Sequence, residues 1–209
     1  MIKLKHKSGL IFKIVFIGVI SICLNFCKKD QMPHYVIPTD LLAYSDFQKG
    51  SYWIYYDNKN NLLDSTYISS KTFETITSNE GPVNPNQYDQ LIVCFSSHVC
   101  TFFKTSVCNG GGMIEVKYAD STYGILDTWM FENPNKYQNW YVVYYPTYYM
   151  EGKAYSDVYQ TRTTALIGSS TICTDNFFAK YFGIIRVITK TNQDTTFNWS
   201  LIRSRIIQK

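Results

Sequence analysis

The sequence predicts an all-β fold, either an antiparallel sandwich or a partly open barrel of roughly nine to eleven strands. Three observations support this prediction. The 209-residue chain contains 18 Tyr and 13 Phe, and aromatic residues favour strands because their rings pack well on a pleated surface. Short segments rich in β-branched and aromatic residues recur between clusters of Asn, Gly and Pro. No long segment has the 3.6-residue periodicity of an amphipathic helix.

The first 26 residues have the features of a secretory signal peptide. Four lysines (Lys3, Lys5, Lys7 and Lys13) occur without any acidic residue, and residues 14–26 carry no charge. A membrane-spanning helix needs about 20 apolar residues, which is longer than this run. We therefore predict a signal peptide over residues 1–26, with an uncleaved membrane anchor as the alternative. Under both interpretations the chain after the apolar run faces outward.

The charge of the chain argues against one class of function. The net charge of +4 comes from 20 Lys and Arg against 16 Asp and Glu, and the four lysines of the signal peptide account for the whole excess. The remaining chain is neutral and has no cluster of basic residues. A nucleic-acid-binding protein needs a basic patch for the phosphate backbone, so we expect no nucleic-acid partner.

The junction after the apolar run resembles the lipobox of bacterial lipoproteins. Leu24 lies three residues before Cys27, and polar residues begin at once with Lys28. Phe26 is larger than the Gly, Ala or Ser that usually precedes the cysteine. The resemblance implies that Cys27 carries a diacylglycerol thioether and an acylated amine, and several acyl chains anchor a protein stably. Because no Asp follows Cys27, the resemblance also implies the outer membrane, in either leaflet.

The domain organisation follows from this junction. Residues 27–40 have no periodic pattern and are predicted to form the lipidated cysteine and its tether. Residues 41–209 are predicted to form a single β-rich domain, because this length suits one core and the segment shows no repeat of fixed period. A helical turn that is capped by Thr39 or Asp40 and ends at Ala43 is expected at the boundary.

Turn residues divide the first half of the domain into strands. Asn58–Asn61 and Asn109–Gly112 are rich in residues that tolerate a left-handed backbone, and each is predicted to join two strands. Ser96–His98 is expected to form the tip of another hairpin, between two apolar runs. The strands expected in this half are residues 51–57, 62–77, 91–95, 99–103 and 113–118.

The second half of the domain continues the same pattern. Phe197, Trp199 and Leu201 alternate with polar residues, which is the period of a strand with one buried face. Asn192–Gln193 is predicted to form the last turn, and Gly183 to mark a bulge or a close backbone approach. The strands expected in this half are residues 123–131, 140–150, 154–165, 184–190 and 196–207.

Two stretches of the domain resemble small bacterial envelope lipoproteins of unknown function. A Gly-x-x-Trp-x-Tyr pattern occupies Gly50–Tyr55, and an Ala-Lys-x-x-Gly-Ile-x-Arg pattern occupies Ala179–Arg186. In that family the patterns belong to an aromatic first strand and to a late strand that begins at a glycine. The resemblance implies an all-β envelope protein, and it implies no activity.

Four cysteines follow Cys27, and an even number in an exported chain indicates two disulfides. A hairpin with its tip at Ser96–His98 would place Cys94 opposite Cys100, and Cys108 would then pair with Cys173. Two other connectivities are possible. Cys94, His98 and Cys100 are an alternative zinc-binding set, but the chain has no Cys-x-x-Cys motif, so we expect no metal.

Few residues of the chain could support catalysis. His34 lies in the expected tether, which leaves His98 for a nucleophilic site, and no Gly-x-Ser-x-Gly motif accompanies it. A glycosidase-like site would need two closely spaced carboxylates. The candidate carboxylates are those of Glu115, Asp120, Asp127 and Glu132. A histidine at a turn and charges at loop ends explain these residues more simply, so we expect no enzymatic activity and no cofactor.

Residues 140–150 contain the best candidates for a binding surface. Aromatic rings on a rigid sheet stack on sugars or peptides, and tyrosine adds a hydroxyl for hydrogen bonding. Because the rings fall on both faces of the expected strand, packing in the core is the alternative interpretation. The candidates are Trp140, Tyr141, Tyr144, Tyr145, Tyr148 and Tyr149.

Three hypotheses for the function follow. The first is a lipid-anchored, non-enzymatic module that binds a glycan or a protein partner through an aromatic surface. The second is a hydrolase of envelope polymers that uses His98 or a carboxylate pair. The third is a structural subunit of an envelope assembly.

Overall fold

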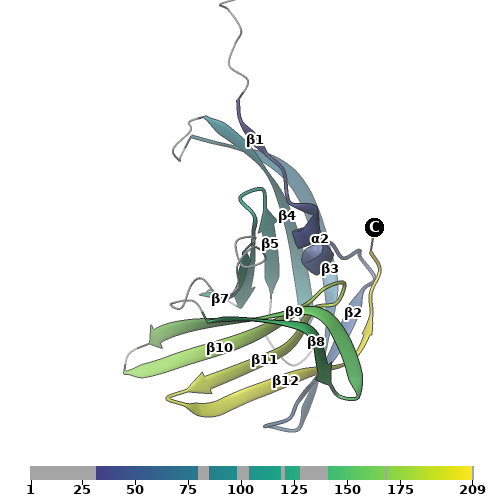
Figure 1. Ribbon diagram of the computed structural model, residues 1–209, viewed down its shortest axis with the longest axis vertical. Coiled ribbons are helices and arrows are strands. Elements are labelled where there is room, and N and C mark those ends of the chain that lie inside the picture. The colour runs from purple at the N-terminus through teal and green to yellow at the C-terminus, as the bar shows by residue number, and fades with distance from the viewer. Residues whose placement is uncertain are drawn as a thin grey trace, which may run out of the picture. The chain divides into compact units, whose positions relative to one another are not determined.

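A curled β-sheet and a short helix make up the body of the protein in the computed structural model (Figure 1). The structure describes residues 32–79, 85–97, 104–118, 121–127, 141–167 and 169–208. Within these ranges the sheet has 12 strands, and the helix α2 (Thr39–Ser45) has 7 residues. The predicted all-β class is therefore confirmed. None of the helical structure in these ranges is long and apolar enough to cross a membrane.

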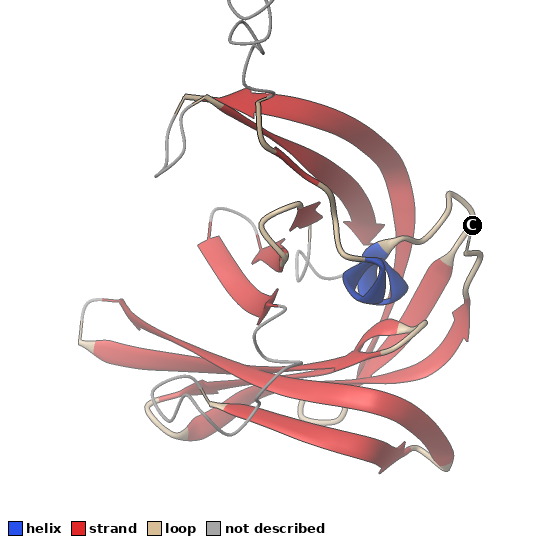
Figure 2. Cartoon of the chain, turned by 45° about the horizontal axis from the view of Figure 1, so that its top comes forward, coloured by secondary structure: helices blue, strands red, loops and turns tan. Residues whose placement is uncertain are grey.

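Eleven of the strands form one antiparallel path. They are β2 (Tyr52–Asp57), β3 (Leu62–Ser78), β4 (Asn86–Ser97), β5 (Thr105–Asn109), β6 (Met113–Tyr118), β7 (Ser121–Asp127), β8 (Val142–Met150), β9 (Lys153–Ile167), β10 (Ser170–Ala179), β11 (Gly183–Thr191) and β12 (Asp194–Arg205). Strands β2 to β7 pair in chain order, and so do β8 to β12, while β12 joins β2. The sheet curls into a half-barrel, and β7 packs against β9 and β10 (Figure 2). This arrangement agrees with the partly open barrel of the prediction.

Alternate side chains of the strands fill the concave side of the half-barrel. In β2, Trp53 and Tyr55 point inward and are 2% and 1% exposed. The indole N–H of Trp53 donates to the carbonyl oxygen of Phe182 at 2.8 Å, and the hydroxyl of Tyr55 donates to that of Ile184 at 2.7 Å. These bonds satisfy polar atoms that burial would otherwise leave unpaired. They also tie β2 to the turn before β11 and to β11 itself.

Helix α2 covers this concave side. Leu41 and Tyr44 point into the core and are 0% and 5% exposed. A helix of 7 residues is too short to be stable alone, so its packing against the sheet stabilises it. Pro38 is the N-cap residue and no side chain caps the helix, so the cap predicted at Thr39 or Asp40 was wrong.

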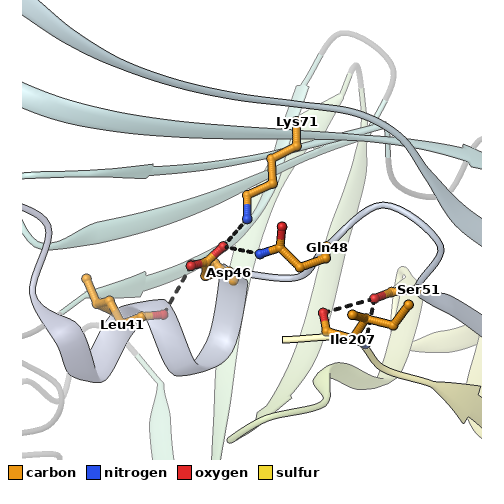
Figure 3. A network of polar contacts seen from close by, with 7 residues as sticks. Leu41, Asp46, Gln48, Ser51, Lys71 and Ile207 are labelled. Carbon is orange, nitrogen blue, oxygen red and sulfur yellow. Dashed lines mark hydrogen bonds and ion pairs between the residues drawn. The ribbon is translucent and has the colours of Figure 1, made fainter. Parts of the chain in front are cut away.

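Polar contacts fix the chain that follows α2 (Figure 3). Lys71 of β3 forms an ion pair with Asp46, whose carboxylate also accepts a hydrogen bond from the side chain of Gln48. The hydroxyl of Ser51 accepts a hydrogen bond from the amide of Ile207 at 2.9 Å and donates to the carbonyl of the same residue at 3.3 Å. The chain at the end of α2 is therefore tied to β3, and the C-terminal segment is tied to Ser51, just before β2.

The body begins earlier in the chain than the sequence predicts. The short strand β1 (His34–Tyr35) pairs in parallel with Gln87–Tyr88 of β4, and Ile37 is only 6% exposed. The compact unit accordingly starts at His34, and not at residue 41. The sequence did not indicate β1, because two strand residues are too few to produce a recognisable pattern. The predicted signal peptide and Cys27 lie outside the described residues.

Strand β4 is longer than predicted, and this changes its pairing. It continues through Ser97, so the hairpin tip expected at Ser96–His98 was wrong. Cys94 pairs with Thr105 of β5, and not with Cys100 as the expected hairpin required. Residues 98–103, which include His98 and Cys100, lie outside the described residues.

Three predicted turns or close approaches are confirmed. The turn Asn109–Gly112 joins β5 to β6, and a Cβ at Gly110 would lie 1.9 Å from the carbonyl oxygen of Tyr35, so this turn packs directly against β1. Asn192 and Gln193 form the last turn with φ values of 49° and 77°. A Cβ at Gly183, whose φ is 74°, would lie 2.9 Å from the ring of Phe47.

Candidate ligand-binding face

The tyrosines of the predicted binding segment lie on or beside the edge strand β8, and they divide between its two faces. The ring of Tyr144 lies 4.9 Å from that of Tyr159, and its hydroxyl donates to Asp157 at 2.7 Å. Tyr159 in turn packs against Tyr44 of α2, so Tyr144 belongs to the concave side. Tyr149 is 78% exposed near the β8–β9 turn. Trp140 lies outside the described residues.

A local irregularity brings Tyr148 onto the opposite, outer face. Asp157 has a φ of 49° within β9, and its expected partner Pro146 does not pair with it. The register is the same on both sides of this position, Tyr145 with Val158 and Thr147 with Ser156, so the left-handed residue interrupts the alternation of the side chains without adding a residue to either strand. Beyond this point the ring of Tyr148 lies 5.3 Å from that of Tyr145 and 5.2 Å from that of Phe177 on β10.

Tyr141 lies at one end of this outer face, next to an ion pair. The guanidinium of Arg162 lies 4.3 Å from the centre of the Tyr141 ring, which is a cation–π contact. The same guanidinium donates from Nε and Nη2 to the two carboxylate oxygens of Asp175, at 2.6 and 2.8 Å. This bidentate pair raises the pKa of Arg162 and fixes its plane under the tyrosine ring.

A second set of contacts runs across the strands beside the first. Arg186 of β11 donates to the hydroxyl of Tyr148 at 2.9 Å and to the side-chain oxygen of Asn198 at 3.1 and 3.2 Å. The hydroxyl of Tyr145 donates to Gln160 at 2.9 Å. Burial, followed by the charges of nearby groups, raises the pKa of Tyr145, so its hydroxyl stays protonated at neutral pH.

We call this surface the outer aromatic face. It spans strands β8 to β12 and combines aromatic rings with guanidinium groups that are already held by neighbouring strands. Its members are Tyr141, Tyr145, Tyr148, Arg162, Asp175, Phe177 and Arg186. Tyr141 is 46% exposed and offers its ring to solvent, whereas Tyr145 and Tyr148 are half-buried and pack against the core. Tyr145 and Tyr148 therefore pack as the core interpretation expects, whereas the ring of Tyr141 is exposed and remains a candidate for binding.

A polar groove of about 640 Å³ adjoins the outer aromatic face at Arg162. Lys190 of β11 lies directly opposite Cys173 of β10, and both side chains line the groove. The other lining residues are Thr171, Asn192 and Gln193. The groove therefore carries two cationic side chains, and no acidic residue is part of its lining.

The concave side of the half-barrel offers much less space. The cavity beneath α2 has a volume of about 20 Å³ and is lined mainly by aromatic and aliphatic side chains, among them Tyr44, Phe47 and Trp53. A space of this size holds about one water molecule. This cavity beneath α2 is therefore too small for a sugar.

The cysteines do not form the disulfide expected between Cys108 and Cys173. Both are free thiols, and so is Cys94. Cys108 lies on β5 and is fully buried beside Ser45 of α2, where burial raises its pKa to about 12. Cys173 lies on β10, with its sulfur 3.6 Å from the hydroxyl of Thr164. The two cysteines lie on β5 and β10, which do not pair with each other in the sheet, so the disulfide prediction was wrong.

One histidine contact was missed by sequence reasoning, which placed His34 in the tether. Its Nε2 lies 2.8 Å from a carboxylate oxygen of Asp89, and the hydroxyl of Thr75 donates to the same oxygen at 2.8 Å. A nucleophilic site needs the hydroxyl on the histidine, with the carboxylate behind it. Here the hydroxyl contacts the carboxylate, so the three residues fasten β1 to β3 and β4.

The predicted acid–base candidates fall on β6, on β7 and outside the described ranges. Glu115 is half-buried, and its carboxylate oxygen lies 3.9 Å from the Nζ of Lys117. Asp127 pairs with Met113, so it lies diagonally across from Glu115 on the same face. His98, Asp120 and Glu132 lie outside the described residues. In the part of the chain that is described, no three His, Cys, Asp or Glu side chains form a group that could hold a metal ion.

Comparisons with known proteins found no matching family model, no matching curated protein and no matching solved structure.

The sequence indicated part of the candidate site and missed the rest. It indicated the tyrosines, but not Arg162, Asp175 or Arg186. Arg162 and Asp175 lie directly opposite each other on neighbouring strands, an arrangement that would indicate an ion pair. This can be predicted only when the register of β9 with β10 is known. Arg186 ends the Ala-Lys-x-x-Gly-Ile-x-Arg pattern, which predicts a structural role for it rather than a place in the site.

Proposed function

We propose that this chain is a lipid-anchored protein of the bacterial outer membrane that binds a glycan through its outer aromatic face and catalyses no reaction. Residues 1–26 would direct export, and lipid on Cys27 would hold the body at the membrane. The binding surface would lie on strands β8 to β12. The observation that carries the proposal is Tyr141, an exposed ring supported from below by Arg162.

The arrangement suits a sugar ligand for two reasons. Sugars bind by stacking their apolar face on an aromatic ring while their hydroxyls take hydrogen bonds from the surrounding polar groups. Arg162 is held in place by Asp175, so its remaining N–H groups are oriented without further loss of side-chain entropy on binding. The cavity beneath α2 is too small for a sugar, which favours the outer face over that cavity as the binding site.

Substitution of Tyr141 tests the glycan proposal. Loss of a stacking ring should weaken binding about tenfold, which corresponds to about 1.4 kcal/mol. The measurement is the retardation of full-length protein in mild detergent during native electrophoresis through gels that contain soluble neutral or acidic polysaccharides. We expect Tyr141→Ala to migrate faster than wild type in the gel that retards wild type.

Tyr149→Ala is the matched control. Tyr149 is more exposed than Tyr141 but lies outside the outer aromatic face, so its loss should leave retardation unchanged. An equal loss of retardation in both variants would point to nonspecific aromatic adhesion. Free migration of the wild type in every polysaccharide would exclude the glycan proposal.

The lipid anchor is tested separately by growing cells with radiolabelled palmitate. The wild-type chain should incorporate the label, and Cys27→Ala should not, because the thiol accepts the diacylglycerol. Several acyl chains, at about 0.8 kcal/mol per buried CH₂, should also keep the wild type in the membrane fraction. Label that persists in the variant would refute Cys27 as the modified residue.

A further inference from the structure

The groove beside Arg162 is lined by cationic side chains, which stacking of a sugar on an aromatic ring does not require. Its cationic side chains come from β9 and β11, and the acid nearest to Arg162, Asp175, has a side chain only 5% exposed. Asp175 is therefore covered by the guanidinium that it binds. A ligand in the groove would meet the positive groups before it could meet this carboxylate.

Lys190 is the cation of the groove that is free to bind a ligand. Within the described ranges no acidic side chain pairs with it, and its register partners are Cys173 on β10 and Thr195 on β12. The acid closest in register, Asp194, lies opposite Thr191, one position further along the hairpin, so alternation turns it towards the other face. A lysine ammonium that is not paired within the protein favours an anionic ligand.

The rim of the groove adds hydrogen-bond donors in a fixed geometry. The side-chain oxygen of Asn192 accepts the amide N–H of Thr171 at 2.9 Å, and the backbone of Asn192 donates to the carbonyl of the same residue at 2.9 Å. Because the oxygen of the Asn192 side chain is used in this way, its NH₂ group is left to donate. The groove thus presents an ammonium, guanidinium N–H groups and an amide N–H, which are the donors that a carboxylate accepts.

We infer that the groove binds the carboxylate of an acidic sugar whose ring stacks on Tyr141, so that the ligand is a polysaccharide that contains uronic acid. This inference rests on the proposed glycan-binding function and specifies its ligand class. Arg162 links the two parts, because it lies under the Tyr141 ring and also lines the groove. Lys190 then selects for the acid, and Tyr141 binds the sugar ring.

The test uses two oligosaccharides that differ only in charge, oligogalacturonate and its methyl ester. Wild-type full-length protein in mild detergent should bind the free acid about tenfold more tightly, because one charge-assisted contact is lost in the ester. Lys190→Gln should lower affinity for the acid to that for the ester and leave the affinity for the ester unchanged. Lys153→Gln, at the exposed start of β9, should change neither affinity.

The possible outcomes separate this inference from the function on which it rests. Equal binding of the acid and the ester, with Tyr141→Ala weakening both, would refute the carboxylate site and retain the glycan surface. If the protein bound neither oligosaccharide, the uronic-acid ligand would be refuted. The glycan proposal would then be kept if neutral polysaccharides retard the protein during electrophoresis, and excluded if they do not. Equally tight binding of poly-glutamate of matched charge would show a general preference for polyanions and overturn the assignment of a sugar.

Discussion

Gly183 and Gly152 both have left-handed backbones, with φ values of 74° and 73°, but their surroundings differ. A Cβ at Gly183 would lie 2.9 Å from the Phe47 ring, whereas a Cβ at Gly152 would meet no atom within 4 Å. The strain of a positive φ costs about 1 kcal/mol in either case, and the clash should add about 1–3 kcal/mol at Gly183 alone. We therefore expect Gly183→Ala to lower the free energy of unfolding by about 2–4 kcal/mol and Gly152→Ala by about 1 kcal/mol. Urea unfolding followed by tryptophan fluorescence measures both, and equal losses would show that Phe47 moves aside.

The two free thiols Cys108 and Cys173 should differ in reactivity. Burial raises the pKa of Cys108 to about 12, so almost no thiolate exists at pH 8, and the side chain is also inaccessible. Cys173 is half-buried and lines the groove. Iodoacetamide should label Cys173 in the native protein and Cys108 only after denaturation, as measured by peptide mass spectrometry. Native labelling of Cys108 at the rate of Cys173 would contradict the packing of α2 on β5.

At the scale of the elements, the attachment of β1 to the sheet should depend on pH, because His34 of β1 contacts the carboxylate of Asp89. The hydrogen bond from His34, followed by that from Thr75, lowers the pKa of this carboxyl below its ordinary value of 3.8. A lowered folded-state pKa means that the ionised group stabilises the fold at pH values above 3.8, and that this contribution is lost as the pH falls through the lowered pKa. Asp89→Asn should therefore be less stable than wild type at pH 5 and lose less stability between pH 5 and pH 2.5.

Urea midpoints at the two pH values test this expectation. Asp194→Asn is the control, because Asp194 is an exposed acid of β12 and should leave the acid sensitivity of the wild type intact. An Asp89→Asn variant that loses as much stability as the wild type on acidification would show that other carboxyls dominate. Hydrogen exchange at Tyr35 should rise in the same variant, since the contact that fastens β1 is weakened.

The same scale explains how far the sequence could predict the structure. Strand β6 coincides with its predicted residues 113–118, because glycine-rich turn chemistry fixes its start. The pairing of Cys94 was missed because a one-residue or two-residue change in hairpin length leaves local composition unaltered and changes every cross-strand partner. The sequence indicated the outer aromatic face only in part for a related reason. The left-handed backbone at Asp157 decides on which side of the sheet Tyr148 lies, and no residue type in the sequence predicts it.

For the whole molecule, the two sides of the half-barrel differ in how their side chains are packed. On the concave side α2 packs against aromatic core residues, and the cavity of about 20 Å³ beneath the helix is too small for a sugar. The outer side of β8 to β12 carries cross-strand polar contacts that hold its rings and guanidinium groups in place. A rigid sheet positions binding groups more accurately than loops do, so the outer side is the better-organised surface for recognition.

The boundary of the folded unit at His34 makes a final prediction about the whole chain. A protein that starts at His34 should be as stable as one that starts at Lys28, because the compact unit begins there. A protein that starts at Thr39 loses β1, the buried side chain of Ile37 and the carbonyl of Pro38, which accepts the amides of Leu41 and Leu42 at 3.1 and 3.3 Å.

The expected loss follows from the burial of Ile37 and from the contact of His34 in β1 with Asp89. Burial of Ile37 contributes about 1.5–3 kcal/mol, and the His34 contact about 0.5–1 kcal/mol because that side chain is 43% exposed, so we expect the free energy of unfolding to fall by about 2–4 kcal/mol. Urea unfolding of the three proteins measures the difference. If the protein that starts at Thr39 matched the longer two, residues 34–38 would be a tether, as the sequence alone suggested. If it were less stable, these five residues would be confirmed as part of the folded unit, and the tether between Cys27 and the sheet would comprise only residues 28–33.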